Sequence, residues 1–314
     1  MAKFQASTSE ISTIPRLIGQ LKGAQPGPTV ILMGGLHGNE PSGIIALEQV
    51  FKALEQQAIT PKGHILALRG NTAALQQGKR YLRYDLNRVW TPELLEQLEQ
   101  QQLTDPAEEW HDVREIQAHV EAALQQAEGP VYFLDLHTTS SDTMPFLATR
   151  NAAAQRAFCQ QFPLPAVLGL DTALPGTLLS LFNNRGHLGL AFEAGSHLDP
   201  AAPAYHEAFV WKSLVLLGCL PAEAVPQLDA IEQELTSLGK GHHGLFEIGF
   251  RYAIGADEQF RMRPGFENFH HVFQGQELAD NQHRTIRAER DGYVFMPLYQ
   301  DQGEDGFFLV QEVD

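Results

Sequence analysis

Apolar residues in the first 220 positions follow two alternating patterns. Four short runs are apolar almost throughout, as expected of buried strands, and three longer stretches repeat apolar residues at helical spacing. The strand-like runs are 29–35, 64–70, 130–137 and 187–195, and the helix-like stretches are 41–57, 110–126 and 203–220. Strands that alternate with helices predict an α/β fold in which helices flank a sheet.

The pattern of residues along the chain changes after residue 220. Residues 221–227 contain two prolines and are typical of a linker, and a short helix is predicted to end near Gly239. The remaining residues form short β-rich runs separated by Gly, Asp and Asn. We therefore predict a larger domain over residues 1–222 and a smaller C-terminal all-β domain over residues 223–314.

Length and charge limit the classes of function. The 314 residues, 43% of them hydrophobic, can bury a large core, and no apolar run approaches the roughly 20 residues that cross a membrane. The start, MAKFQASTSEIST, lacks the apolar segment of a secretory leader. A formal charge of −16 disfavours nucleic acid and anionic membranes as partners. We expect a cytoplasmic protein that acts on a small molecule, and the sequence leaves a homo-oligomer open.

A histidine and a glutamate stand where the first buried strand ends and a helix begins. His37 and Glu40 are three residues apart in GGLHGNEPSG, at the kind of strand end where open α/β sheets bind ligands. Neutral imidazole and carboxylate are both good zinc ligands, and the glycines allow a tight bend. The alternative is a histidine that pairs with a carboxylate at a helix N-terminus.

The third buried run adds a second histidine. It ends FLDLHTTS, so His137 reaches the end of the same kind of strand, and two histidines with one glutamate are typical of a catalytic zinc site with an open position. Residues two apart on a strand share a face, so Asp135 is expected to accept a hydrogen bond from a ligating imidazole. A purely structural acceptor at the strand end is the alternative for Asp135.

A carboxylate also interrupts the fourth buried run. Glu193 lies in AFEAG, and an unpaired buried carboxylate costs several kcal/mol, so it should serve a metal, a cation or a catalytic step. A glutamate beside a zinc-activated water can take its proton and pass it to the leaving group. The alternative is a structural ion pair.

The segment GKRYLRYDLNRVW supplies cations within an otherwise acidic chain. Arg80 and Arg88 flank Asp85 and Asn87 among aromatic and aliphatic residues, which favours a loop of the site over a surface cluster of ion pairs. We expect Asp85, like Asp135, to support the site from behind its ligands.

Four motifs occur in the order and approximate spacing of one known family. HGNEPSG, RYLRYDLNR, LDLHTT and FEAG resemble the motifs of the succinylglutamate desuccinylase/aspartoacylase family, relatives of the zinc carboxypeptidases. The resemblance is clear over roughly residues 29–220 and looser beyond them. It implies a three-layer α/β/α zinc carboxypeptidase-like domain that holds one zinc ion on His37, Glu40 and His137.

The resemblance also implies roles for the remaining site residues. Glu193 would be the general base, and Arg80 would polarise the scissile carbonyl. Asn87 and Arg88 would bind the α-carboxylate of an N-acyl amino acid.

The sequence departs from the family where the substrate side chain is recognised. Aspartoacylases place a tyrosine and an arginine shortly before the catalytic glutamate, whereas this chain has no tyrosine there and offers Arg185 at a shifted position. Near the C-terminus, Phe307 and Phe308 stand where the family often has a tyrosine. These departures weaken the case for an acyl-aspartate or acyl-glutamate and leave room for a more apolar substrate.

The leading hypothesis is a zinc-dependent deacylase that hydrolyses the amide bond of a small N-acyl amino acid. One alternative is a metallocarboxypeptidase that trims a peptide, and another is a non-catalytic metal-binding or sensor protein. A β domain folded over the site would exclude long peptides, and we expect residues 223–314 to do so. The ligand types favour zinc, although manganese or cobalt can occupy such a site.

Overall fold

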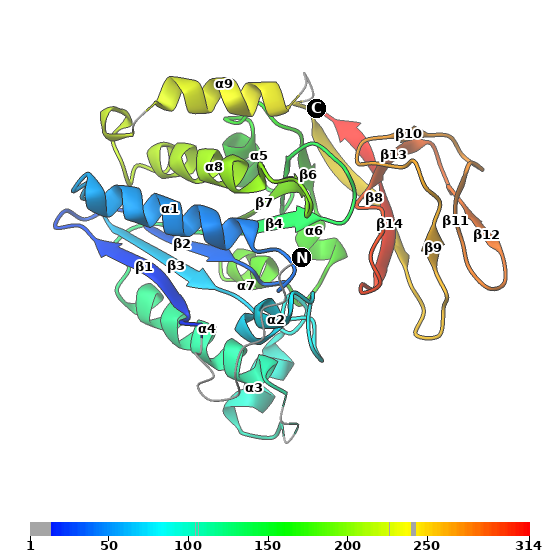
Figure 1. Cartoon of the computed structure of the whole chain (residues 1–314), viewed down its shortest axis with the longest axis horizontal. Helices are drawn as coiled ribbons and strands as arrows, with labels where there is room; N and C mark the ends of the chain where they lie inside the picture. Colours follow the sequence, from blue (N-terminus) through cyan, green and yellow to red (C-terminus); the bar gives the residue numbers. More distant parts are fainter. Residues whose placement is uncertain (1–13, 104, 106, 226, 240–242) are drawn as a thin grey trace, which may run out of the picture.

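A long mixed sheet organises the fold in the computed structural model, which describes residues 14–103, 105, 107–225, 227–239 and 243–314 (Figure 1). The start of the chain, where the sequence predicts no secretory leader, lies outside these residues. In the described part the sheet has eleven strands, in the order β1-β3-β2-β4-β7-β5-β6-β8-β14-β13-β10. Their bounds are β1 Leu17–Lys22, β2 Thr29–Gly34, β3 His64–Arg69, β4 Val131–Thr139, β5 Phe146–Thr149, β6 Ala166–Leu168, β7 Leu188–Ser196, β8 Leu245–Ala253, β10 His271–Val272, β13 Gly292–Phe295 and β14 Asp305–Val313.

The middle of the sheet is parallel and buried on both faces. Strands β3, β2, β4 and β7 pair in parallel, and the four predicted apolar runs correspond to them. Along β2, Val30 and Leu32 pack into one core, whereas Ile31 and Met33 pack into the other. The runs are apolar almost throughout because the side chains on both faces of each strand are buried in a core.

Helices cover both faces of this sheet and complete three layers (Figure 1). On one face lie α1 (Ser42–Gln56), α5 (Ala153–Cys159), α8 (Ala202–Leu216) and α9 (Leu228–Leu238). On the other lie α3 (Pro92–Glu99), α4 (Glu109–Gln125) and α7 (Leu178–Asn184). Short helices α2 (Thr72–Gln77), α6 (Leu170–Ala173) and η1 (Ala222–Ala224) lie in connections. The predicted three-layer α/β architecture is confirmed.

The C-terminal region is rich in β-structure, as predicted, but it is not set apart from the main sheet. Strand β8 pairs in parallel with β6, so β8, β14, β13 and β10 extend the large sheet. A second sheet contains β9 (Arg261–Met262), β11 (Glu277–Asp280) and β12 (Thr285–Arg287), and the region has its own apolar core. The division near residue 222 stays a prediction.

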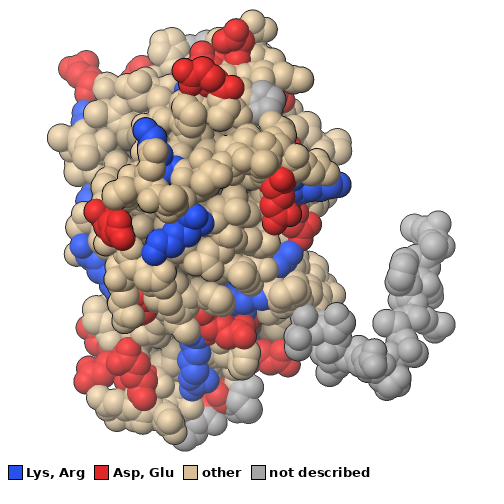
Figure 2. Space-filling model, turned by 90° about the vertical axis from the view of Figure 1, so that its left-hand side faces the viewer, with Lys and Arg blue, Asp and Glu red and all other residues tan. Residues whose placement is uncertain are grey.

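The charge on the surface and the hydropathy of the helices are two properties that concern possible partners. On the face that Figure 2 presents, Lys and Arg side chains are interspersed with Asp and Glu. None of the helices in the described part of the chain combines the length and the apolar character that a membrane crossing requires.

Candidate metal centre and substrate pocket

The turn after β2 brings His37 and Glu40 to the carboxyl end of the sheet. Gly35 has φ +73°, a conformation that favours glycine, and a Cβ on Gly38 would lie 2.2 Å from the carbonyl carbon of Ala74. The Glu40 N–H donates to the His37 carbonyl at 3.1 Å, which closes the turn. Both side chains therefore emerge beside the end of β4, the parallel neighbour of β2.

Three buried side chains converge at this point. His37 Nδ1 lies 2.8 Å from one oxygen of Glu40, and His137 Nδ1 lies 3.0 Å from the other. One ligand atom from each residue lies within 4.8 Å of the others. The Thr138 N–H donates to Glu40 at 3.0 Å and fixes the carboxylate between the rings. The donor set, two imidazole nitrogens and a carboxylate, fits a zinc ion.

Each imidazole has a second carboxylate behind it. His37 Nε2 lies 3.2 Å from Asp85 Oδ1, and His137 Nε2 lies 3.0 Å from Asp135 Oδ2. Carboxylates in this position hold the tautomer and orientation of metal-ligating histidines. Both residues therefore lie where the sequence predicted support for the site.

The charges around the three side chains shift their proton affinities strongly. Burial alone would raise the pKa of Glu40, but the two neighbouring histidines hold that pKa well below its usual range. Burial alone would lower the pKa of His137, but the carboxylates of Asp135 and Glu40 hold it well above the ordinary value. A divalent cation could replace the proton that this arrangement attracts.

Glu193 lies on the strand next to His137. The two residues are paired in the register of β4 and β7, and Glu193 is buried. Among the described residues its Oε2 atom has no hydrogen-bond partner. Burial raises the pKa of Glu193 to about 8, which suits a group that accepts and returns a proton near neutral pH.

The loop between α2 and α3 is anchored by α4 and places Arg80 beside Glu40. Buried Glu109 of α4 accepts the backbone N–H groups of Leu82 and Arg83, each at 2.9 Å. Arg80 Nη2 donates to Asp85 at 2.9 Å, and its Nη1 lies 3.8 Å from Glu40. The Arg83 side chain is exposed.

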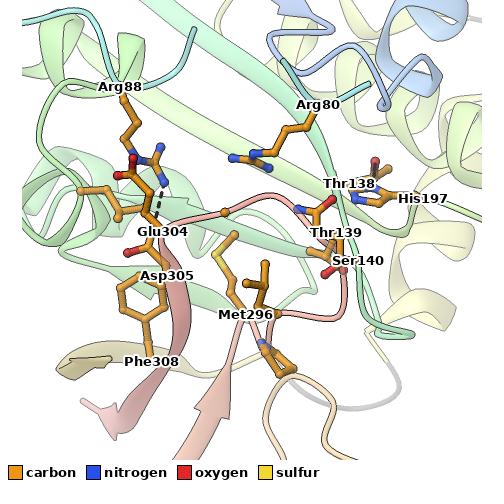
Figure 3. A pocket seen from close by; sticks show the side chains of 15 residues that line it. Arg80, Arg88, Thr138, Thr139, Ser140, His197, Met296, Glu304, Asp305 and Phe308 are labelled. Atoms are coloured by element: carbon orange, nitrogen blue, oxygen red, sulfur yellow. Dashed lines mark hydrogen bonds and ion pairs between the residues drawn. The ribbon is translucent and has the colours of Figure 1, made fainter. Parts of the chain in front are cut away.

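Asn87 and Arg88 follow in the same loop and face the pocket. Asn87 Oδ1 accepts the Leu178 N–H at 3.0 Å, and Asn87 Nδ2 lies 3.4 Å from His137 Nε2. Arg88 Nη2 donates to Asp305 of the C-terminal region at 2.9 Å, an ion pair drawn as a dashed line in Figure 3. Eight of the nine predicted site residues thus line one hollow, and the ninth, Asp85, contacts His37 and Arg80.

This hollow has two connected parts. The inner pocket is lined by the three converging side chains of His37, Glu40 and His137, by Glu193 and Asn87, and by an apolar wall that includes Leu174 and Met296. The outer pocket, shown in Figure 3, is lined by the following residues, which the sequence interpretation did not single out: Thr138, Thr139, Ser140, His197, Met296, Glu304 and Asp305. His197 Nδ1 lies 2.8 Å from Thr138 Oγ1. The tripeptide TTS after His137 was the available signal for the first three. Beyond residue 295 the resemblance to the family had drawn attention to Phe308, which lines this pocket, but not to Met296, Glu304 or Asp305.

Two of the residues noted for departing from the family lie away from the hollow. Arg185 pairs with Glu121 at 2.6 Å on the outside of the protein, and Phe307 is buried in the C-terminal core. Phe308 lines the outer pocket. The shifted arginine therefore does not supply a cation to this site.

A second group of potential ligands, His111, Asp112 and Glu115, lies elsewhere in the described part of the chain. Arg16 forms ion pairs with Asp112 and with Glu115. Because a guanidinium already neutralises these acids, the group is a poor cation site.

The fold and the site together define a class of protein. It is a three-layer α/β protein that gathers two histidines and several carboxylates where parallel strands end, beside a pocket with two arginines. The sequence model described as "Succinylglutamate desuccinylase/Aspartoacylase catalytic domain" matches residues 26–209. The chain belongs to the succinylglutamate desuccinylase/aspartoacylase family, as its motifs predicted.

Individual relatives are distant. A succinylglutamate desuccinylase of Pseudomonas fluorescens (strain SBW25) is 38% identical over 64 residues, which cover 20% of this chain and 19% of the relative. That of Yersinia pseudotuberculosis serotype O:3 (strain YPIII) is 27% identical over 165 residues, covering 50% and 48%. The chain thus spans between about a fifth and a half of the length of these relatives. A crystal structure of a succinylglutamate desuccinylase/aspartoacylase from Rhodobacter sphaeroides has a similar fold, with a TM-score of 0.64, 18% identity and coverage of 94% and 88%.

Proposed function

We propose that this protein is a zinc-dependent hydrolase that cleaves the amide bond of a small N-acyl amino acid. One zinc ion per chain would be held by His37, Glu40 and His137, and it would act as a Lewis acid toward water and the amide carbonyl. The observation that carries the proposal is the convergence of both Nδ1 atoms on the Glu40 carboxylate, with Glu193 paired to His137 on the next strand.

Glu193 is proposed as the general base. Its carboxylate would take a proton from the attacking water as the new C–O bond forms, and would deliver it to the nitrogen as the C–N bond breaks. A free carboxylate and an amine leave. Burial raises the pKa of Glu193, so its carboxylate has a high affinity for the proton that it would take from water.

Arg80 is proposed to stabilise the negative charge that develops on the carbonyl oxygen. Its guanidinium is anchored by Asp85, which reduces the reorganisation that substrate binding would require. Asn87 and Arg88 are proposed to hold the α-carboxylate of the substrate, with the donors that their present partners leave free.

The C-terminal region favours a small substrate over a peptide. Residues 296–305 lie against the outer pocket, so we propose that a domain over residues 223–314 covers the site. A peptidase needs an open groove for a long chain, and a covered site would not provide one. The metallocarboxypeptidase is therefore the second candidate.

The test is hydrolysis of a panel of N-acyl amino acids and short peptides by protein loaded with zinc, manganese or cobalt. Glu193→Gln is isosteric and should keep metal stoichiometry while losing about 10²- to 10⁴-fold in kcat. Cleavage of peptides in preference to acyl amino acids would support the peptidase. Stoichiometric metal binding without any hydrolysis would refute the deacylase and favour a sensor.

A further inference from the structure

The side chain of Asp305, in the C-terminal region, is paired with Arg88, the arginine that the proposed function assigns to the substrate carboxylate. Asp305, the first residue of β14, is 217 residues from Arg88 in sequence, yet its Oδ2 accepts from Arg88 Nη2 at 2.9 Å. Its Oδ1 accepts from Arg251 Nε at 2.6 Å. The Asp305 side chain is only 12% exposed, so water screens these pairs weakly. Figure 3 shows the contact at the edge of the outer pocket.

Arg88 nevertheless keeps donors for one more group. Besides the bond to Asp305, its Nη1 donates to the Asn87 carbonyl at 2.8 Å. Its Nε is buried and, among the described residues, has no hydrogen-bond partner. A guanidinium has five N–H groups, so Arg88 keeps N–H donors for one substrate carboxylate. Its positive charge is already partly offset by Asp305, which it shares with Arg251.

Within the part of the chain that the structure describes, the hollow offers no unpaired cation. Arg80 and Arg88 are the lysines or arginines among the described residues that line it, and Arg80 is paired with Asp85. The inner wall is apolar, with members at Leu170, Leu174, Leu179, Ala191 and Met296. A second carboxylate on a bound substrate would have to be desolvated against this wall without a counter-charge.

We propose that Asp305 is a specificity-determining residue that limits the pocket to N-acyl amino acids with one carboxylate and an uncharged side chain. This inference rests on the proposed function. The Asp305 carboxylate takes the place that a second substrate carboxylate would need near Arg88 and Arg251, and it repels a dicarboxylate that approaches them.

The test compares Asp305→Asn with wild type on N-acetylmethionine and N-acetylaspartate. The amide keeps the size and a hydrogen-bond acceptor but removes the charge. Asp301→Asn makes the same change at a nearby exposed residue that does not line the hollow and, among the described residues, forms no ion pair. Asp305→Ser is the second variant if Asp305→Asn lowers the melting temperature strongly.

Wild type should prefer N-acetylmethionine. Asp305→Asn should raise kcat/KM for N-acetylaspartate by about tenfold or more, as expected for one charge-assisted contact, whereas Asp301→Asn should raise it by less than about threefold. Equal gains in the two variants, or a wild type that prefers the dicarboxylate, would overturn the assignment.

Calorimetric binding of the free amino acids methionine and aspartate separates this inference from the proposed function. If no variant hydrolyses either substrate but Asp305→Asn alone binds aspartate about tenfold more tightly, the deacylase proposal fails and the role of Asp305 stands. If hydrolysis occurs and neither kcat/KM nor binding shifts toward the dicarboxylate, the deacylase stands and the role of Asp305 fails.

Discussion

Asp135→Asn is the change that tests the proposed metal centre most directly. Asp135 is fully buried on β4, and its Oδ2 lies 3.0 Å from His137 Nε2. Within the described residues neither of its oxygens has a hydrogen-bond partner, so the ion pair with His137 is its main polar contact. The substitution keeps the shape of the side chain and removes the charge that holds the ring of His137. The corresponding change at Asp85 is less informative, because Asp85 also pairs with Arg80.

The expected loss follows from this geometry. A carboxylate behind a ligating histidine contributes about 10- to 100-fold to metal affinity. That range corresponds to about 1.4 to 2.8 kcal/mol of binding free energy. We expect the upper half of the range, because a fully buried pair is not screened by solvent.

The measurement is competition for zinc between the protein and a chromophoric chelator at neutral pH. Asp142→Asn, the same change at an exposed position shortly after β4, is the matched control and should leave the zinc dissociation constant within about twofold. A wild type that binds one zinc ion and an Asp135→Asn variant that binds it with unchanged affinity would refute the reasoning.

Three further predictions address the pocket and the core. His197→Ala should raise KM by about tenfold while metal content stays constant, because one hydrogen-bonding group is lost from the outer pocket; an unchanged KM in steady-state kinetics would mean that the substrate does not reach it. Arg185→Ala should leave kcat/KM within about twofold, since Arg185 pairs with Glu121 on the surface, and a tenfold loss would place it in the site. Phe209→Ala should lower the free energy of unfolding by about 3 to 5 kcal/mol in urea titrations, because its fully buried ring stacks on that of Phe192 with the ring centroids 4.4 Å apart. A variant with unchanged stability would contradict that packing.

The sequence predicted the buried strands well and the short ones poorly. Strands β2, β3, β4 and β7 are recognisable because two cores require continuous apolar residues. Strands β5 and β6 have four and three residues, too few for a pattern, and they exist because neighbouring strands pair with them. Strand β1 is an edge strand that mixes exposed and half-buried positions equally, which resembles the pattern of a loop.

The positions of the site residues on strand ends were predictable for a related reason. Parallel strands that share a sheet present their carboxyl ends at one edge, so His137 and Glu193 had to approach each other once their strands were recognised. The two-residue spacing likewise placed Asp135 beside His137. Their chemical roles remain predictions that the experiments above address.

The contact of Asp305 with Arg88 could not be predicted in this way, because a partner 217 residues away depends on how the C-terminal strands join the sheet. Its position follows from a series of strand pairings, which includes a register shift between Asp305 and Phe307. Asp305 pairs with Ala253 across β14 and β8, β8 pairs with β6, β6 with β5, and Phe146 of β5 lies opposite Glu193. A continuous series of hydrogen-bonded strands thus joins Asp305 to Glu193. Because a slip of one residue would turn side chains to the opposite face of the sheet, the residue proposed to select the substrate and the residue proposed to act on it are held in one frame.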